Sequence, residues 1–327
     1  MIHFCTYFDA NYLTRAIALY RSLERYAPAF TLWALCMDDE AYETLDGLAL
    51  PGLRPIRLAD LEAADPELLA AKDTRTRIEY YFTCSPAYPR FLMRSHPEID
   101  LITYLDADLL FFSSPEPIFT ELGEGSVLIV PHRYAVESAE LEIYGRFNVG
   151  LVGFRNDERG HAILERWRAQ CIEWCYDRAE GERYADQRYL DEWPGQPGVV
   201  VLENPGAGLA PWNAMTHAVD IATDPPTVDG HALVFYHFAG VRQVGRGLWD
   251  TRSDQYGVIG RRVRFRLYGR YIAELEQAAA LVRGWANRRG GHGASLRTPR
   301  TSTRRLFGRI RHGQVIVSNM TGLLRRL

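Results

Sequence analysis

The first hundred residues alternate between short apolar runs and stretches in which apolar residues recur at helical spacing. The apolar runs at residues 2–8 and 30–38 predict buried strands. Helical periodicity predicts four helices, at residues 11–27, 38–48, 60–72 and 77–95. Pro86 and Pro89 are expected to kink or split the last of these helices. Strands that alternate with helices are typical of an α/β domain with a mostly parallel sheet.

The second half of the chain adds more strands, separated by loops rich in glycine and proline. Strands are predicted at residues 126–132, 147–156, 198–204 and 232–240. Helices are predicted at residues 160–177 and around 263–285. We therefore predict an α/β domain over residues 1–260, a C-terminal helix over 261–285 and a basic tail over 286–327 that is flexible or contacts a membrane.

The charge of the chain is unevenly distributed. The net charge is −3, but residues 281–327 contain 11 arginines and no acidic residue, which leaves 27 basic and 41 acidic residues in the body. A basic tail that mixes arginine with leucine, isoleucine and valine suits peripheral contact with an anionic membrane, and an ordinary solvated tail is the alternative. The acidic body argues against nucleic acid as a specific partner.

The composition is that of a globular protein without a membrane span. Apolar residues make up 47% of the chain, and no apolar run approaches the length needed to cross a bilayer. The five cysteines contain no C-x-x-C pair and are expected to be packing residues. With no signal peptide apparent at the N-terminus, these features favour the cytoplasm, peripheral on the inner face of the membrane if the tail binds lipid.

Two aspartates interrupt the apolar segment "DLITYLDADLLFF" at residues 100–112. Residues i and i+2 of a strand face the same way, so the side chains of Asp106 and Asp108 should project together. Buried carboxylates need donors or a cation, and ligands of parallel α/β sheets gather at the carboxyl ends of the strands. The pair therefore suits Mg²⁺ or Mn²⁺ bound to a substrate's phosphates, with a solvated cap of the following segment as the alternative.

His237 ends the apolar strand "LVFYHFAG", and Gly240 follows where the chain turns. A lone histidine in such a place is usually a satisfied turn or core residue. Beside an Asp-x-Asp pair it becomes a candidate for a third metal ligand.

The segment "YLDADLLFFSSPEPIF" and the downstream "HFAG" resemble the nucleotide-sugar glycosyltransferases of the GT-A fold, and glycosyltransferase family eight in particular. The resemblance covers roughly residues 2–250. It implies a Rossmann-like α/β fold, a UDP-sugar donor, Mn²⁺ or Mg²⁺, a glycan or lipid-linked acceptor, and retention at the anomeric carbon. The chain is thus expected to be a metal-dependent glycosyltransferase with a basic C-terminal extension.

The same resemblance implies roles for individual residues. The metal would be held by Asp106, Asp108 and His237. The donor nucleotide would be held by the residues that match the family's loop, helix and strand positions, namely Asp9, Asn11, Tyr12, Arg90, Asp106 and Asp108. Asn148 would face the transferred sugar, Asp186 would lie near its hydroxyls, and Gln187 would lie near the anomeric centre.

One departure from the family pattern concerns the lysine that contacts the donor diphosphate. The family often continues H-x-x-G-x-x-K-P-W after the histidine, and this chain has Gln243 at the lysine's place. Arg242 or Arg246 is the expected source of the missing charge. The departure leaves open a degenerate protein that binds nucleotide sugar without turnover.

Two other enzyme classes share part of the pattern. Aspartyl-phosphate phosphatases also end an apolar strand in Asp-x-Asp, where the first aspartate attacks phosphorus. They carry the motif at the start of the fold, whereas about 100 residues precede it here, and Leu110 stands where they usually have Thr or Val. A nucleotidyltransferase would require a glycine-rich phosphate loop near the N-terminus, and the sequence shows none.

Overall fold

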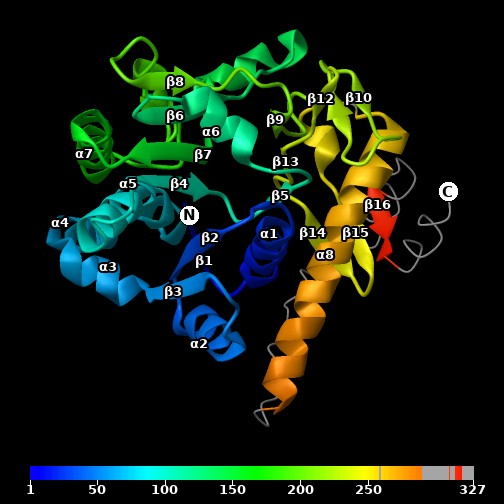
Figure 1. Cartoon of the computed structure of the whole chain (residues 1–327), viewed down its shortest axis with the longest axis horizontal. Helices are drawn as coiled ribbons and strands as arrows, with labels where there is room; N and C mark the ends of the chain where they lie inside the picture. The colour runs from blue at the N-terminus through cyan, green and yellow to red at the C-terminus, as the bar shows by residue number, and fades with distance from the viewer. Residues whose placement is uncertain (258, 289–308, 310–313, 319–327) are drawn as a thin grey trace.

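The centre of the protein is a seven-stranded sheet, seen here in a computed structural model that describes residues 1–257, 259–288, 309 and 314–318. The strand order is β3-β2-β1-β4-β7-β6-β8, and β1 to β4 are parallel (Figure 1). Strand β7 is antiparallel to both of its neighbours. The strands are β1 (Ile2–Phe8), β2 (Phe30–Cys36), β3 (Leu53–Arg57), β4 (Leu101–Leu105), β6 (Val127–Pro131), β7 (Phe147–Arg155) and β8 (Val199–Val201).

Helices cover both faces of this sheet. One core cluster joins α1 and α2 to one face, and a second joins α3, α4, α5 and α7 to the other. Successive residues of β1 illustrate the division, because Phe4 belongs to the first cluster and Cys5 to the second. These helices are α1 (Leu13–Tyr26), α2 (Asp39–Leu48), α3 (Leu58–Ala64), α4 (Pro66–Ala71), α5 (Arg77–Ser95), α6 (Glu116–Leu122) and α7 (Glu158–Glu173).

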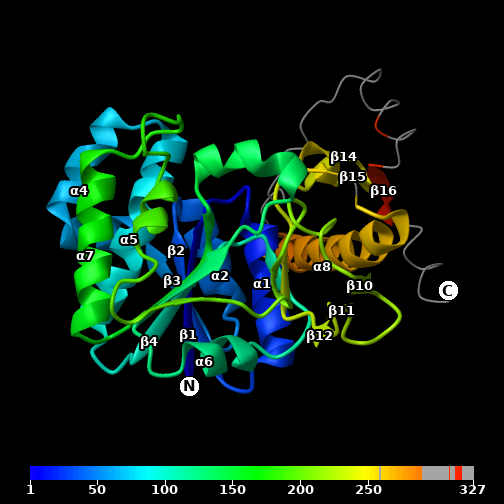
Figure 2. The ribbon, with the colours of Figure 1, turned by 90° about the horizontal axis from the view of Figure 1, so that it is seen from above.

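Helix α8 (Arg261–Arg288) lies on the side of the domain opposite α7 (Figure 2). It packs against α1 and α2 and extends three residues beyond the predicted end at 285. No helix among the described residues is long and apolar enough to cross a membrane.

Smaller sheets connect the central sheet to α8. The one next to the Asp-x-Asp segment has the order β5-β13-β9, and the other two have the orders β10-β11-β12 and β14-β15-β16. Their strands are β5 (Leu109–Phe111), β9 (Ala207–Leu209), β10 (Val219–Asp220), β11 (Thr227–Val228), β12 (His231–Ala232), β13 (Phe235–His237), β14 (Arg242–Gly245), β15 (Leu248–Asp250) and β16 (Val315–Val317).

Most predicted elements are present, and the α/β fold class is confirmed. Two helices differ from expectation. The helix predicted at 60–72 is two short helices, because Asp65 caps a new helix that begins at Pro66. Helix α5 is not split at Pro86 and Pro89, which are both buried; packing against the sheet and α7 keeps the helix continuous.

Part of the predicted flexible tail is packed instead. Strand β16 pairs antiparallel with β15, and Ile316 belongs to a buried core cluster. Gln314 is also buried and accepts hydrogen bonds from Thr251 and Ser253. The prediction of a flexible tail from residue 286 is therefore wrong for residues 314–318. Residues 289–308, 310–313 and 319–327 lie outside the described part, so membrane contact of the tail stays a prediction.

Candidate active site

The pairing of two short strands brings Asp106, Asp108 and His237 together. Strand β4 ends at Leu105, and after the aspartates β5 pairs antiparallel with β13, with Leu109 opposite His237. The backbone N–H of Phe238 also donates to the carbonyl of Asp108, at 3.0 Å. One potential ligand atom from each of the three side chains lies within 4.8 Å of the others.

His237 contacts both carboxylates through Nε2. Its Nε2 is 3.1 Å from Asp108 Oδ1 and 3.7 Å from Asp106 Oδ2. Burial alone would lower the pKa of His237, but the two carboxylates raise it above its usual value. Burial would likewise raise the pKa of Asp108, but the charge and hydrogen bond of His237 and the charge of Arg15 lower it. Without a metal, the group therefore attracts a proton, as a site built for positive charge should.

Asp106 differs from its neighbour. Tyr104 donates a hydrogen bond of 2.7 Å to Asp106 Oδ1. The pKa of Asp106 is nevertheless raised, because desolvation and repulsion by Asp108 outweigh the attraction of His237. Two carboxylates and one imidazole nitrogen at this spacing suit a hard or borderline divalent cation.

A cavity of about 400 Å³ opens beside these carboxylates. Its wall comes from the end of β1, the start of α5 and the Asp-x-Asp segment, and is lined by Tyr7, Asp9, Tyr12, Arg77, Tyr81 and Tyr104. Asp9 is buried and accepts hydrogen bonds from Arg77 Nη2 at 2.7 Å and from the Asn11 backbone N–H at 2.9 Å. The structure thus places Asp9 and Tyr12 at the cavity.

Asn11 lies at the border of a second, larger cavity of about 1280 Å³ and donates its side-chain N–H to Asp9 at 3.2 Å. Arg15, Gln243, Arg242 and Arg246 line this second cavity. Arg15 lies 4.2 Å from the ring centre of Tyr12, and Tyr12 lines both cavities. The second cavity therefore adjoins the first at Tyr12 and Arg77.

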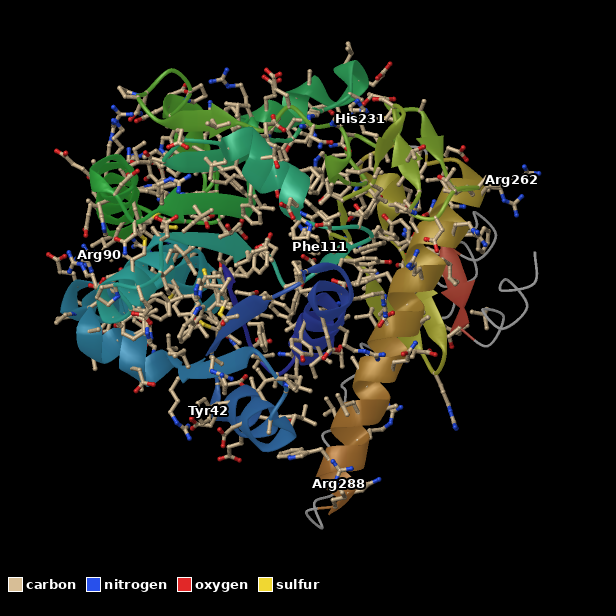
Figure 3. The ribbon with its side chains drawn as sticks, viewed as in Figure 1. Tyr42, Arg90, Phe111, His231, Arg262 and Arg288 are labelled. Atoms are coloured by element: carbon tan, nitrogen blue, oxygen red, sulfur yellow. The ribbon has the colours of Figure 1, made fainter. Side chains whose placement is uncertain are left out.

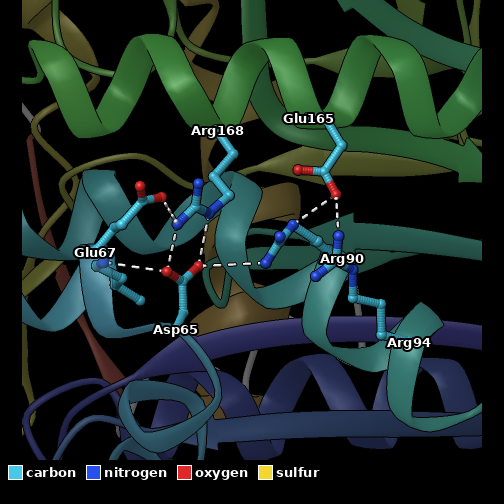
Figure 4. A network of polar contacts seen from close by, with 7 residues as sticks. Asp65, Glu67, Arg90, Arg94, Glu165 and Arg168 are labelled. Carbon is cyan, nitrogen blue, oxygen red and sulfur yellow. Dashed lines mark hydrogen bonds and ion pairs between the residues drawn. The ribbon is translucent and has the colours of Figure 1, made fainter.

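Arg90 lies elsewhere, and its expected place at the donor site is wrong. Its guanidinium binds Glu165 on α7 at 2.7 Å and Asp65 at 3.5 Å, and Arg90 is not among the residues that line the cavity. Figure 3 shows Arg90 at the edge of the molecule, beside α5 and α7. Packing of α5 against α7 directs this face of the helix toward acidic partners (Figure 4). Arg77, at the start of the same helix, lines the cavity instead. The sequence held no signal that distinguished the two arginines.

Asn148 lies beside His237, and Gln187 lies beside Asn148. Asn148 Oδ1 is 3.2 Å from His237 Nδ1, and Asn148 Nδ2 is 3.4 Å from Gln187 Oε1. Gln187 Nε2 donates to the Tyr144 carbonyl at 2.8 Å. His132, which the sequence analysis missed, is 3.1 Å from Asn148 Nδ2, and burial lowers its pKa to about 3. Its position at the end of the predicted strand 126–132 was the available signal.

Asp186 is buried, and the charge of Asp106 acts on it. Burial raises the pKa of its carboxyl to about 7, although Ser85 hydrogen-bonds to it, and the charge of Asp106 adds to the shift. Trp167 Nε1 donates to the Asp186 backbone carbonyl at 2.8 Å and holds this segment in place. A carboxyl that is partly protonated at neutral pH can both donate and accept hydrogen bonds.

Asp186→Asn should change how stability depends on pH. Because the pKa of Asp186 is about 7 in the folded state and near 3.8 when unperturbed, the folded protein keeps a proton that the unfolded chain loses. The contribution of Asp186 to stability is therefore full below about pH 4 and is lost as the pH rises toward about 7. In EDTA-treated protein, the variant should exceed wild type in unfolding free energy by at least about 1.4 kcal/mol near pH 8 and match it near pH 4. Urea titrations at both pH values measure this, and a difference that does not vary with pH would contradict it.

Comparison with solved structures defines the class of fold. The galactosyltransferase LgtC, solved with donor and acceptor sugar analogues, is 17% identical; the match covers 73% of this chain and 87% of LgtC, with a TM-score of 0.50. The glycosyltransferase GlyE of Streptococcus pneumoniae TIGR4 is 16% identical over 92% of this chain and 66% of GlyE, with a TM-score of 0.51. The chain therefore has the GT-A glycosyltransferase fold, as its resemblance to family eight implied.

Sequence comparison gives the family. Two proteins of Bacillus subtilis (strain 168) match the sequence. YfnD is 35% identical over 73% of this chain and 77% of YfnD. YfnF is 33% identical over 74% of this chain and 82% of YfnF. The chain belongs to the family of YfnD and YfnF, both of which are uncharacterized. No protein-family model matches the sequence.

Proposed function

We propose that the protein is a metal-dependent glycosyltransferase that moves a sugar from a nucleotide-diphosphate sugar to a glycan or lipid-linked acceptor. The observation that carries the proposal is the convergence of Asp106, Asp108 and His237 beside a cavity in a GT-A fold. The solved glycosyltransferases LgtC and GlyE share this fold. UDP as the nucleotide and retention at the anomeric carbon are proposed from the family resemblance.

Mn²⁺ or Mg²⁺ would be held by Asp106, Asp108 and His237. Their carboxylate oxygens and imidazole nitrogen match the ligand preferences of these ions, and the raised pKa of His237 reflects a site that attracts positive charge. Such a cation offsets the negative charge that builds on the leaving diphosphate.

Arg15 is the residue best placed to supply the charge that Gln243 does not. Its guanidinium donates to the carbonyl of Val241 at 2.6 Å, which holds it between α1 and the segment after β13, and its charge reaches Asp108. The side chain of Arg242 is 3.4 Å from the buried carboxylate of Asp250, and Arg246 lines the second, larger cavity rather than the first. We propose that Arg15 stabilises the departing diphosphate, in place of the arginines first expected.

The remaining site residues orient the donor. Asp9 and Tyr12 lie where the nucleotide base is expected, with Asn11 holding Asp9 and Arg77 pairing with it. Asp186, which is able to donate and accept hydrogen bonds, would orient the sugar hydroxyls, and Gln187 would lie near the anomeric centre. The arginine-rich tail would bring the protein to an anionic membrane, where lipid-linked acceptors are found.

Calorimetric titration of UDP with and without Mn²⁺ tests this proposal. We expect wild type to bind UDP far more tightly when Mn²⁺ is present, or to bind it only then. Asp108→Ala should lose this gain in UDP affinity from the metal. Asp100→Ala is a matched control, because Asp100 precedes the same strand at its other end and its side chain is 79% exposed. This control should bind UDP as wild type does.

Two other results would redirect the assignment. Metal-dependent UDP binding without hydrolysis or transfer of any donor sugar would indicate a degenerate nucleotide-sugar-binding protein. Absence of nucleotide binding with any metal, together with release of phosphate from p-nitrophenyl phosphate, would indicate the phosphatase.

A further inference from the structure

Asn148 contacts His237 on the side of the ring opposite the two aspartates, and His132 contacts Asn148 in turn. We infer that they are positioning residues, which hold His237 in the tautomer that carries its proton on Nδ1 and leaves Nε2 as the metal ligand. The inference rests on the proposed function, because the ligand role of His237 belongs to it. It also gives Asn148 a role different from the sugar contact that the family resemblance implied.

The backbone of Gly150 determines which way the Asn148 amide faces. Its N–H, which can only donate, is 2.9 Å from the side-chain oxygen of Asn148. The opposite amide orientation would place an NH₂ group against this N–H, donor against donor. The oxygen of Asn148 therefore occupies this position, and the NH₂ group points the other way.

The tautomer of His237 follows from this orientation. Asn148 Oδ1 is an acceptor only, and it lies 3.2 Å from His237 Nδ1. The hydrogen of this contact must therefore be on Nδ1. The lone pair of Nε2 then faces Asp108 and Asp106, at 3.1 and 3.7 Å. A lone pair aimed at two carboxylates is unfavourable unless a proton or a cation lies between them, which is what a metal ligand requires.

His132 completes the arrangement on the other side of Asn148. The NH₂ group of Asn148 donates to His132 Nε2 at 3.1 Å, so this nitrogen must be an acceptor and the ring must be neutral. His132 is 3% exposed, and this burial disfavours a charge on its ring. The imidazole thus fixes the outer end of the amide.

The hydrogen bonds of Asn148 are fully used within the protein. An asparagine side chain has two N–H donors and an oxygen with two lone pairs. The oxygen accepts from Gly150 and His237, and the NH₂ group faces His132 and Gln187. No strong donor or acceptor remains for a sugar hydroxyl, so Asn148 acts through His237.

Gly150 must lack a side chain for Asn148 and His237 to approach each other here. A Cβ built at this position would lie 2.9 Å from His237 Nδ1 and would overlap Asn148 Oδ1. Gly150→Ala should therefore displace the Asn148–His237 contact without removing any donor or acceptor. It provides a variant that breaks the arrangement sterically.

The tautomer can be read in the loaded protein by nitrogen-15 NMR of the histidine imidazoles. The measurement uses full-length protein with UDP and the diamagnetic ion Mg²⁺, because without a cation the two carboxylates themselves attract a proton to Nε2. His237→Gln identifies the His237 signals among the nine histidines. Wild type should show a slowly exchanging proton on Nδ1. Asn148→Leu and Gly150→Ala should make that proton exchange faster, because its acceptor is removed or displaced. Trp212→Phe, which alters a ring packed 5.1 Å from His237 but no bond of the arrangement, should leave the exchange of that proton unchanged.

Metal affinity provides the second readout. Calorimetry of Mn²⁺ in the presence of UDP should show about 10- to 100-fold weaker binding for Asn148→Leu, the usual cost of losing a partner behind a ligand. His132→Leu should also weaken binding. His132→Gln should restore much of it, because a glutamine oxygen can reach the place of Nε2 and accept from Asn148. Urea unfolding of each variant shows that it is folded.

The outcomes separate this inference from the proposed function. Loaded wild type without a proton on His237 Nδ1, or an Asn148→Leu variant with unchanged exchange of that proton and unchanged Mn²⁺ affinity, would overturn the inference while leaving the metal site. Equal losses of Mn²⁺ affinity for His132→Leu and His132→Gln would overturn the role of His132. If wild type binds neither Mn²⁺ nor Mg²⁺, with or without UDP, the proposed function fails, and the positioning role fails with it.

Discussion

Asp108→Asn is expected to lower Mn²⁺-dependent hydrolysis of a UDP-sugar by at least about 1,000-fold in kcat/KM, or about 4 kcal/mol of transition-state stabilisation. The substitution keeps the size of the side chain and removes one of the two negative charges that would hold the cation. Since the leaving diphosphate gains its charge in the transition state, a weakened cation site should affect turnover more than donor binding. Acceptor-free hydrolysis of the donor, followed by release of UDP, measures this without knowledge of the acceptor.

Two comparisons make this expectation specific. Asp100→Asn removes a carboxylate from the other end of the same segment, where the side chain pairs with Arg155 at 3.0 Å, and should retain wild-type turnover. An Asp108→Asn protein that unfolds at the same urea concentration as wild type excludes misfolding as the cause. Retention of more than about one tenth of the activity would contradict a metal role for Asp108.

Arg168→Ala is expected to destabilise the protein by about 3–5 kcal/mol. The side chain of Arg168 is 9% exposed and binds the buried Asp65, with Nε 2.6 Å from Oδ2 and a second contact through Nη2 (Figure 4). Burial alone would raise the pKa of Asp65, but the hydrogen bonds of Arg168 and of the Leu68 N–H lower it below its usual value. Truncation of Arg168 leaves this carboxylate buried, with the hydrogen bond from the Leu68 N–H and a 3.5 Å contact to Arg90 as its remaining compensation.

A second arginine on α7 provides the control. Arg166 pairs with Glu192 at the surface, where its side chain is 55% exposed. Arg166→Ala should cost no more than about 1 kcal/mol, because exposed ion pairs contribute little. Urea unfolding of both variants at one pH gives the comparison. Equal losses of unfolding free energy for Arg168→Ala and Arg166→Ala would show that the contacts of Asp65 do not hold α4 to α7.

The network at Arg168 also explains why one site prediction was wrong. Arg90 and Arg77 both belong to α5, and the resemblance pointed to Arg90. Glu165 and Asp65 lie against the Arg90 end of the helix, whereas Asp9 lies against Arg77. Which arginine meets the cavity depends on the elements that pack around the helix, and α7 lies about 70 residues further along the chain.

Other parts of the site were readable before the fold was known. The Asp106–Asp108 spacing, the apolar strand before it and the histidine at the end of a later strand are local patterns, and they predicted that the two carboxylates would lie together. In the structure the pair lies in the turn between β4 and β5 rather than within a strand. No local pattern revealed that His132 and Gly150 would enclose Asn148. These contacts depend on the register between β6 and β7, where Val130 lies opposite Asn148.

The sequence by itself determined the order of strands and helices and the chemistry available at the ends of the strands. These properties follow from apolar periodicity and residue type, which act over a few neighbouring residues. Only the tertiary structure decided which groups meet: His237 joins the aspartates through the pairing of β13 with β5, and β16 packs onto β15 from beyond residue 313. Such pairings join segments far apart in the chain, and their free energy depends on the complete packing of the core rather than on any local pattern.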